Sequence, residues 1–114
     1  MILRLWRGWT EPDQSLAYEK LLLDRIAPAI LERRIPGLRE LTVLRRDPRE
    51  LDPARSGETL TAMTFDDLDA VAAFTGGSPS ASVVPASARK VLARFDQHSQ
   101  HYISLATFPS KLTG

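Results

Sequence analysis

Alternating apolar and polar side chains predict four β-strands in this chain of 114 residues. In the first, Ile2–Trp9, bulky apolar residues alternate with arginine and glycine, as in a strand with two unlike faces. The second and third, Leu38–Arg45 and Glu58–Phe65, flank a polar, proline-containing stretch at 47–57 that we expect to be a long exposed hairpin loop. The fourth strand is expected over Gln100–Thr107.

Two segments between these strands follow the period of a helix. The first spans residues 13–34, where we expect Pro28 to kink the helix or divide it in two. Its apolar face is expected to comprise Leu16, Leu22, Leu23, Ile26, Ala27 and Ile30. The second begins after the Asp66–Asp67 pair, which can cap it, and ends at the Gly76–Gly77 pair. A further short helical stretch is expected over about 83–94.

The resulting order, β-α-β-β-α-β, predicts an α+β fold: a ferredoxin-like sandwich with a four-stranded antiparallel sheet and both helices on one face. We expect one domain over residues 1–107, followed by a weakly ordered tail over 108–114. The helices then leave the other face of the sheet bare, although several of its side chains are apolar or aromatic. An exposed apolar face of that size usually marks an interface, so we predict a homodimer in which two sheets pack face to face.

Composition argues against several classes of function. The chain has no cysteine, which excludes disulfides, thiolate metal sites and a cysteine nucleophile. Its 15 basic and 14 acidic side chains balance to +1, which is unlike a protein that binds nucleic acid through its phosphates. No apolar run approaches the roughly 20 residues that cross a membrane, and the N-terminus lacks the apolar core of a signal peptide. We therefore expect a cytoplasmic protein.

The two histidines, His98 and His101, are the side chains best suited to act as a base near neutral pH. Because they lie three residues apart at the fourth strand, we expect them to face opposite ways. His101 is the better candidate, since it shares its strand phase with Ile103 and Leu105, which we expect to point inward. The alternative is a structural histidine, hydrogen-bonded at a strand end. No third ligand has the spacing of a metal site, so no metal is expected.

Glu19 falls inside the apolar face predicted for the first helix. A carboxylate in that position must be paired, protonated or turned toward a polar cavity. It is therefore a candidate acid in a pocket, or a group that orients a histidine. The alternative is a side chain near the start of the helix that reaches solvent or pairs with an arginine.

The first strand carries two tryptophans and two arginines. Trp6 and Trp9 lie three residues apart, so one is expected to line the core or a pocket and the other to meet the dimer partner. Arg4 and Arg7 lie beside them. An arginine on a covered face needs an acidic partner or an anionic ligand. Salt bridges across the dimer are the simpler explanation.

Several strings, in this order, resemble a known family and together cover nearly the whole chain. They are Ile2-Leu-Arg-Leu-Trp-Arg-Gly-Trp-Thr10, Ile35-Pro-Gly37, Val43-Leu-Arg-Arg46, Thr64-Phe-Asp-Asp-Leu-Asp-Ala-Val-Ala-Ala-Phe74, and Val84-Pro85 followed by Phe95-Asp96 and His101-Tyr-Ile103. The set resembles the antibiotic-biosynthesis-monooxygenase-like group of the dimeric α+β barrel superfamily.

This resemblance implies oxygenation without a cofactor. In members of that type, an electron-rich phenol or quinol is deprotonated and reacts directly with dioxygen in a mostly apolar pocket between sheet and helices. No cofactor is then expected, and the partners are a second copy of the chain and a small hydrophobic or aromatic ligand. The heme-degrading branch uses an asparagine, a tryptophan and a histidine. Because the chain contains no asparagine, that route is disfavoured.

On this hypothesis the chain is a monooxygenase acting on an aromatic or polyketide-like molecule, with His101 as a base or hydrogen-bond donor and Glu19 as a second catalytic candidate. The substrate-binding candidates are Trp6, Tyr18, Phe65 and Tyr102. The superfamily also includes decarboxylases and ligand-binding sensors, so two alternatives stay open. One is a dimer that binds a hydrophobic small molecule without converting it, and the other is a protein whose pocket is filled by its own side chains.

Overall fold

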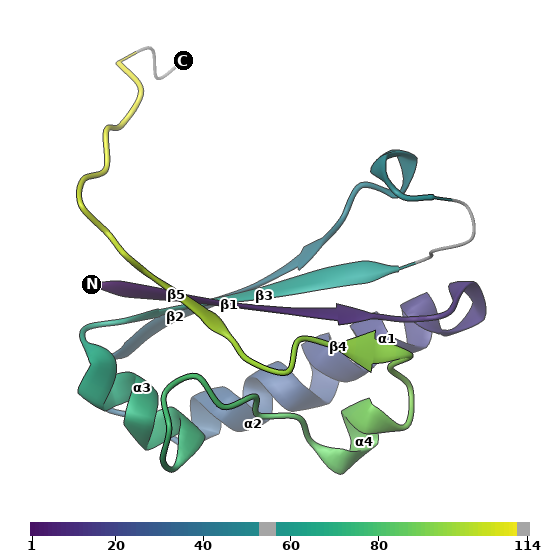
Figure 1. The fold of residues 1–114 in the computed structure, drawn as a ribbon, viewed down its shortest axis with the longest axis horizontal. Helices are drawn as coiled ribbons and strands as arrows, with labels where there is room; N and C mark the ends of the chain where they lie inside the picture. The colour runs from purple at the N-terminus through teal and green to yellow at the C-terminus, as the bar shows by residue number, and fades with distance from the viewer. Residues whose placement is uncertain (53–56, 112–114) are drawn as a thin grey trace.

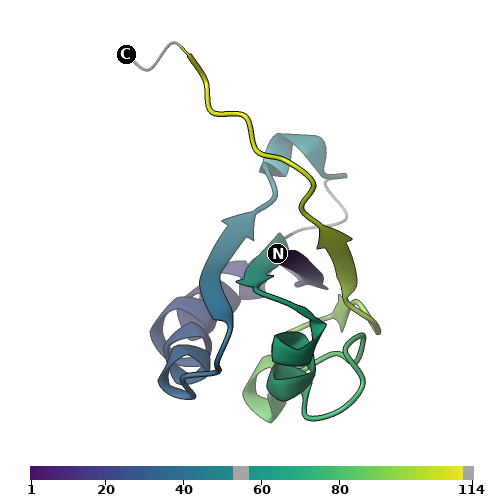
Figure 2. The ribbon, with the colours of Figure 1, turned by 90° about the vertical axis from the view of Figure 1, so that its left-hand side faces the viewer.

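The structure, a computed structural model, describes residues 1–52 and 57–111. An antiparallel sheet forms one layer, and the helices form a second layer against one of its faces (Figures 1 and 2). The strands are β1 Ile2–Trp9, β2 Leu38–Arg45, β3 Glu58–Phe65, β4 Arg94–Phe95 and β5 Gln100–Ile103. The helices are α1 Ser15–Leu21, α2 Ala27–Glu32, α3 Leu68–Thr75 and α4 Ala86–Arg89. The predicted α+β, ferredoxin-like fold is confirmed.

The sheet has five strands where four were predicted, because the last strand is divided in two. The order is β2-β3-β1, and both β4 and β5 pair with the remaining edge of β1. β4 lies opposite Gly8 and Trp9, and β5 lies opposite the start of β1, from Ile2 to Leu5. Together they act as one interrupted edge strand, so the overall topology is the predicted one.

The last strand is also shorter than predicted, since it ends at Ile103 rather than Thr107. Ile103 pairs with Ile2, and one further hydrogen bond joins the Ser104 N–H to the Met1 carbonyl oxygen at 3.0 Å. Beyond that point β1 offers no partner, and the chain leaves the sheet (Figure 1). Ile103 and Leu105 were expected to point inward, but they are 71% and 93% exposed.

The first helix is divided by a π-helical turn, Leu22–Ile26, in which the Ala27 N–H donates to the Leu22 carbonyl five residues back. The turn immediately precedes Pro28, which has no N–H and displaces the carbonyl four residues before it. The predicted interruption near Pro28 is therefore confirmed. The predicted apolar face is partly wrong. Leu22 is buried as predicted, but Leu16 and Leu23 are exposed, and Tyr18, which was not placed on that face, is buried.

The second helix that the sequence predicts is α3, and it begins and ends at the predicted residues. The Asp67 carboxylate accepts a hydrogen bond from the Ala70 N–H at 2.9 Å, and Gly76 ends the helix with φ of 79°. The later helical stretch is shorter than expected, because only α4 is helical. The predicted hairpin loop contains a 3₁₀ turn, Pro48–Glu50, while its residues 53–56 lie outside the described part. Within the described ranges, no helix is long and apolar enough to cross a membrane.

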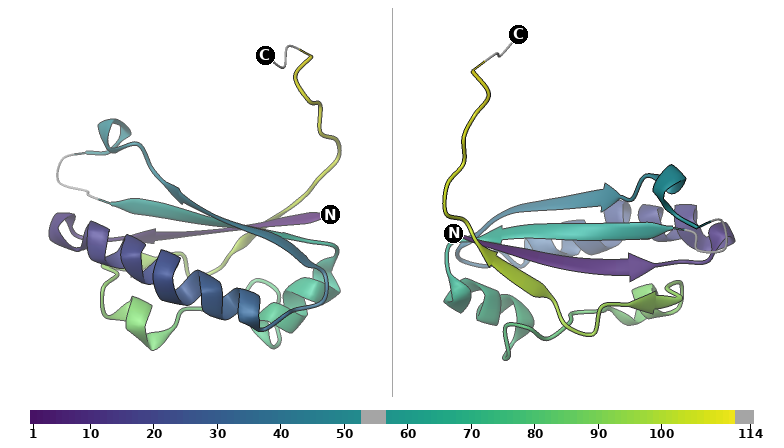
Figure 3. Two further views of the ribbon diagram at one scale, coloured as in Figure 1. Left: turned by 180° about the vertical axis from the view of Figure 1, so that it is seen from behind. Right: turned by 45° about the horizontal axis from the view of Figure 1, so that its top comes forward.

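Two clusters of buried side chains fill the space between sheet and helices. The larger one lies between the sheet and α3 and contains Ile2, Ile35, Met63, Phe65, Ala70, Val71 and Phe74. The smaller one lies between α1 and α4 and contains Tyr18, Leu22 and Ala88. Figure 3 shows that the helices lie beneath the sheet, whose other face is left uncovered.

Candidate functional site

A pocket of about 50 Å³ lies between the sheet and the helices, with walls drawn from both clusters. Because successive side chains of a strand point to opposite faces of the sheet, only every second one faces the pocket. These are Arg4 and Trp6 from β1, Leu41 and Val43 from β2, and Thr61 and Met63 from β3. The opposite wall includes Tyr18, Leu22, Ile26, Ile30, Phe74 and Val83. Most of the lining is apolar.

The volume of this pocket limits what can enter without rearrangement. An apolar cavity of about 150 Å³ is large enough to bind benzene. At about 50 Å³, this pocket admits an aromatic ring only if some wall side chains move aside. Ile26 and Ile30 are only partly buried, so the helix that carries the π turn is one wall that can adjust. The geometry favours a compact ligand over one with several fused rings.

Arg4 is the charged side chain in the pocket wall, and it is only 3% exposed. Its Nη1 donates to the carbonyl oxygen of Pro79 at 2.5 Å, and its Nη2 donates to that of Ala81 at 2.7 Å. The ring of Phe74 lies 5.4 Å from the guanidinium carbon. Burial lowers the pKa of Arg4 to about 10, so the group is still a cation at neutral pH.

His101 lies directly opposite Arg4 in the pairing of β1 with β5, and its Nε2 is 3.0 Å from Arg4 Nη1. A guanidinium can only donate, so Nε2 is the acceptor and the ring proton belongs on Nδ1. Burial, and then the charge of Arg4, lower the pKa of His101. The histidine is therefore neutral near pH 7. It lies behind Arg4 rather than among the pocket-lining residues.

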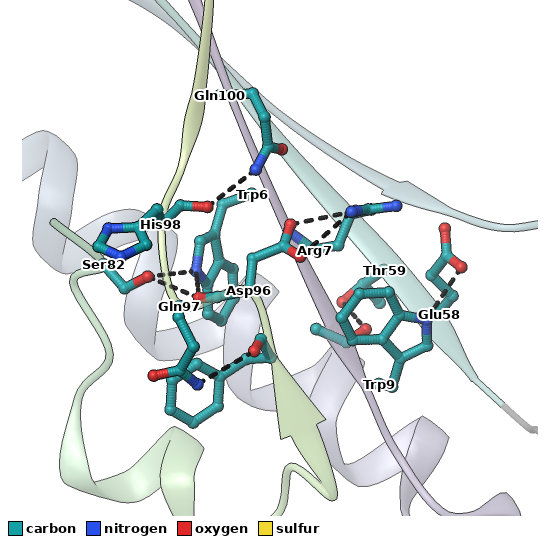
Figure 4. Close-up of polar contacts among 12 residues, drawn as sticks. Trp6, Arg7, Trp9, Glu58, Thr59, Ser82, Asp96, Gln97, His98 and Gln100 are labelled. Atoms are coloured by element: carbon teal, nitrogen blue, oxygen red, sulfur yellow. Dashed lines mark hydrogen bonds and ion pairs between the residues drawn. The ribbon is translucent and has the colours of Figure 1, made fainter. Parts of the chain in front are cut away.

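The indole of Trp6 is held in one orientation by its N–H, which is 3.1 Å from Ser82 Oγ and 2.9 Å from the Asp96 carbonyl oxygen (Figure 4). The Ser82 hydroxyl donates to the same carbonyl at 2.6 Å. The ring also packs against Phe95, with centroids 5.8 Å apart. Since its N–H is already used, Trp6 presents an apolar ring surface to the pocket and no free donor. Trp6, a candidate substrate-binding residue, therefore lies in the pocket wall.

Tyr18 lies in the opposite wall and is 1% exposed. Burial raises the pKa of its phenol to about 12, and a hydrogen bond with Thr59 opposes that rise only in part. The phenol therefore stays protonated. Tyr18, a candidate substrate-binding residue, therefore lies in the pocket as a neutral phenol.

The other face of β1 carries a separate polar network. Arg7 donates to the Asp96 carboxylate at 3.1 and 3.2 Å, and the Trp9 N–H donates to Glu58 at 3.0 Å (Figure 4). The guanidinium of Arg94 stacks over the Trp9 ring, 4.3 Å from its centroid. The two tryptophans thus point to opposite faces, as the spacing predicts.

Three predicted site residues lie outside the pocket. Glu19 forms a two-pronged ion pair with Arg45 on β2, at 2.6 and 2.8 Å, so it is a paired, partly buried carboxylate outside this pocket. Phe65 is fully buried in the larger cluster, packed against Phe74 of α3. Tyr102 is 57% exposed, because it lies on the opposite side of β5 from His101. His98 is also exposed. In the described part of the chain, no three His, Asp or Glu side chains group to hold a metal ion.

The sequence analysis missed the loop that closes the pocket beside Arg4. Pro79 and Ala81 supply backbone carbonyls to Arg4, and Ser82 supplies a hydroxyl to Trp6. The only local signal is that this segment has no regular secondary structure, which leaves its carbonyls available to a buried donor. Which side chain they meet depends on how the loop packs against β1.

No family model matches the chain, and no curated protein matches it significantly. Solved structures do match it. A protein from Chloroflexus aurantiacus J-10-fl, provisionally named an antibiotic biosynthesis monooxygenase, superposes with a TM-score of 0.58 over 96% of this chain and 98% of its own, at 17% identity. A Bacillus cereus protein with the same provisional name gives 0.55 over 96% of each chain, at 10% identity.

A protein of the ethyl tert-butyl ether D family from Bacillus halodurans C-125 is similar as well, with a TM-score of 0.53 over 92% of this chain and all of its own, at 19% identity. These likenesses extend over nearly the whole chain. They confirm the predicted resemblance at the level of the fold, which is the fold of antibiotic-biosynthesis-monooxygenase-like proteins.

Proposed function

We propose that this chain is a cofactor-independent monooxygenase that oxidises a small aromatic molecule in the pocket between sheet and helices. The observation that carries the proposal is the apolar pocket, walled by the fixed ring of Trp6, in a fold shared with proteins provisionally named antibiotic biosynthesis monooxygenases. Apolar, partly enclosed sites suit aromatic ligands, and ring-on-ring contact with Trp6 would orient one.

The reaction needs no electron donor other than the substrate. One oxygen atom of dioxygen enters the product and the other leaves as water. Oxidation of a one-ring hydroquinone to its hydroxyquinone removes two electrons from the ring hydroxyls and two more where a ring C–H becomes C–OH, and these four electrons are the number that dioxygen accepts. The substrate must first lose a proton, because the anion is the form that transfers an electron readily to dioxygen.

A second function, binding without conversion, is favoured by a different observation. Among the described residues that line the pocket, there is no histidine or carboxylate that could take a proton from the ligand. His101 is close, but its Nε2 accepts from Arg4. The monooxygenase proposal therefore applies to compact substrates acidic enough to ionise without a general base, such as one-ring hydroquinones.

Dioxygen uptake with a panel of one-ring hydroquinones tests the proposal. Ala27 lines the pocket, so we expect Ala27→Leu to fill part of it and slow uptake at least about tenfold. Ala29→Leu, on the exposed side of α2, is the matched control and should react like the wild type. Equal uptake in both variants would contradict the proposal.

The binding alternative has its own measurement. In a Trp9→Phe chain, Trp6 is the remaining tryptophan, so its fluorescence reports on the pocket. Quenching of this fluorescence by the same compounds, without dioxygen uptake or quinone formation, would favour binding over turnover.

The proposed partner is a second copy of the chain, bound through the uncovered face of the sheet. Side chains that point to that face from β1, β3 and β2 include Leu3, Leu5, Leu60, Ala62 and Leu44. The helices lie against the opposite face (Figure 2). The segment after β5 leaves the sheet on the uncovered side and carries Leu105 and Phe108, which are 93% and 89% exposed (Figure 1). This much exposed apolar surface supports a face-to-face dimer.

A further inference from the structure

Arg4 is a buried cation that lacks a carboxylate partner among the described residues. Its neighbour on the strand, Arg7, and also Arg39 and Arg45, are about half exposed or more, and each pairs with an aspartate or glutamate. Removing a guanidinium from water is unfavourable unless an anion or several acceptors compensate for it. Leucine or methionine would fill the same volume without that cost, so packing alone does not explain an arginine here.

The neutral groups around Arg4 satisfy only part of its guanidinium. Arginine has five N–H donors. The Pro79 carbonyl and His101 Nε2 accept from Nη1, and the Ala81 carbonyl accepts from Nη2. In the described structure, the N–H on Nε and the second N–H on Nη2 have no such acceptor. Arg4 also lies in the pocket wall, which leaves these two donors to a ligand.

The surroundings of these donors indicate the class of ligand. The Phe74 ring covers one face of the guanidinium, so a ligand oxygen has to approach along its edge. The rest of the pocket is mostly apolar, so the body of the ligand must be apolar too. In such surroundings a charge-assisted hydrogen bond is stronger than in water. A hydrated polyanion such as a nucleotide fits neither the volume nor the lining.

We propose that Arg4 binds the anionic oxygen of an aromatic carboxylate or phenolate in this pocket, and that His101 positions the guanidinium through its neutral Nε2. The assignment rests on the proposed function, because it names the ligand class of the same pocket. It also accounts for how a substrate ionises there without a general base: a fixed positive charge stabilises the phenolate. A purely structural Arg4, tying the loop to β1, would give the pocket no preference for anions.

Calorimetry with benzoate and benzamide, which have the same ring and nearly the same size, measures that preference. We expect the wild-type chain to bind benzoate at least about tenfold more tightly than benzamide. Arg4→Met should abolish the difference while leaving benzamide affinity within about twofold. Arg39→Met removes an exposed arginine that is paired with Asp66, and it should change neither affinity.

Two further measurements keep the test valid if Arg4→Met does not fold. Arg4→Lys keeps the charge but loses the planar fork, so it should retain part of the benzoate preference. In the wild-type chain alone, the absorbance of bound 4-nitrophenol should show its pKa lowered by about 1, because Arg4 favours the phenolate. This second ligand separates the phenolate case from the carboxylate case.

The role of His101 is tested by a pair of variants. His101→Ala removes the acceptor for Arg4 Nη1 and should weaken benzoate binding several-fold without changing benzamide binding. His101→Gln supplies an amide oxygen in its place and should restore the preference.

The outcomes separate the two proposals. Equal affinity for benzoate and benzamide in the wild type, or a preference that survives Arg4→Met, overturns the role of Arg4 and leaves the pocket proposal standing. Binding of neither compound contradicts the pocket as a ligand site and overturns both.

Discussion

Titration of His101 should make the folding stability depend on pH, and substitution of this one residue can isolate its contribution. Its pKa in the folded chain is lowered by burial and by Arg4, so between the folded and unfolded pKa values the unfolded chain binds more protons. The contribution of neutral His101 to folding stability should therefore be fully present above the unfolded pKa, about 6.5, and should be lost as the pH drops below it. We expect denaturant unfolding to give a lower free energy at pH 5 than at pH 8.

The contribution of His101 to that slope can be isolated by substitution. His101→Gln keeps an acceptor for Arg4 but does not titrate, so the stability difference between pH 5 and pH 8 should shrink. His98→Gln changes the exposed histidine and should leave the difference unchanged. An identical slope in wild type and His101→Gln would contradict the assignment.

At the residue scale, the sequence predicts which face of the sheet a side chain points to better than it predicts the position of that side chain along the sheet. Alternation correctly directs Trp6 and His101 toward the helices. Phe65 also points to that face, but it packs against α3, away from the pocket. Tyr102 follows His101 directly, so alternation itself separates the two, although both fell within the resembling string. The position of Arg4 beside Pro79 and Ala81 depends on tertiary packing, which no local pattern contains.

At the scale of elements, a π turn explains why the apolar face of the first helix was misjudged. An ideal α-helix advances 100° per residue, so residues four apart drift by about 40° per step. The wider π turn absorbs much of that drift, and the pocket-lining side chains follow a spacing of four: Tyr18, Leu22, Ile26 and Ile30. A uniform helical wheel instead places Leu16, Leu23 and Glu19 inside the apolar arc. Pro28 signals the interruption but not its geometry.

Two glycines at element boundaries provide a matched stability test. Gly37 and Gly76 both have positive φ, 87° and 79°, which is strained for any residue with a Cβ. A Cβ at Gly76 would meet nothing within 4 Å, whereas one at Gly37 would lie 2.7 Å from the Ala70 Cβ, where α3 packs. We expect Gly76→Ala to lower the free energy of unfolding by about 1 kcal/mol. Gly37→Ala should lose about 1–3 kcal/mol more.

Denaturant melts of the two variants measure these losses directly. Equal losses would mean that α3 moves away from the new methyl group at little cost. The tight packing between Gly37 and Ala70 would then not be needed for the position of α3.

At the scale of the whole molecule, the last strand is shorter than its local pattern predicts. Local pattern extends it to Thr107, yet pairing stops near Ile103 because β1 begins at Ile2. A strand is only as long as its partner, and the partner is determined by the fold. The apolar residues that follow, Leu105 and Phe108, are almost fully exposed in the described part of the chain. Their exposure and that of the sheet face both support the proposed dimer.

The dimer is tested by placing a charge in the centre of the uncovered face. Leu5 lies on the central strand β1, between Ala62 of β3 and Gln100 of β5, and points to that face. In a monomer Leu5→Glu stays in contact with water and is tolerated, whereas in a face-to-face dimer it buries an unpaired carboxylate.

Sedimentation at micromolar concentration should give the mass of two chains for the wild type. The same measurement should give one chain for Leu5→Glu, with dimer affinity reduced at least about a hundredfold. Leu16→Glu, at a 77% exposed position on α1, is the control and should remain dimeric. A monomeric wild type, or a dimeric Leu5→Glu chain, would exclude this face as the interface.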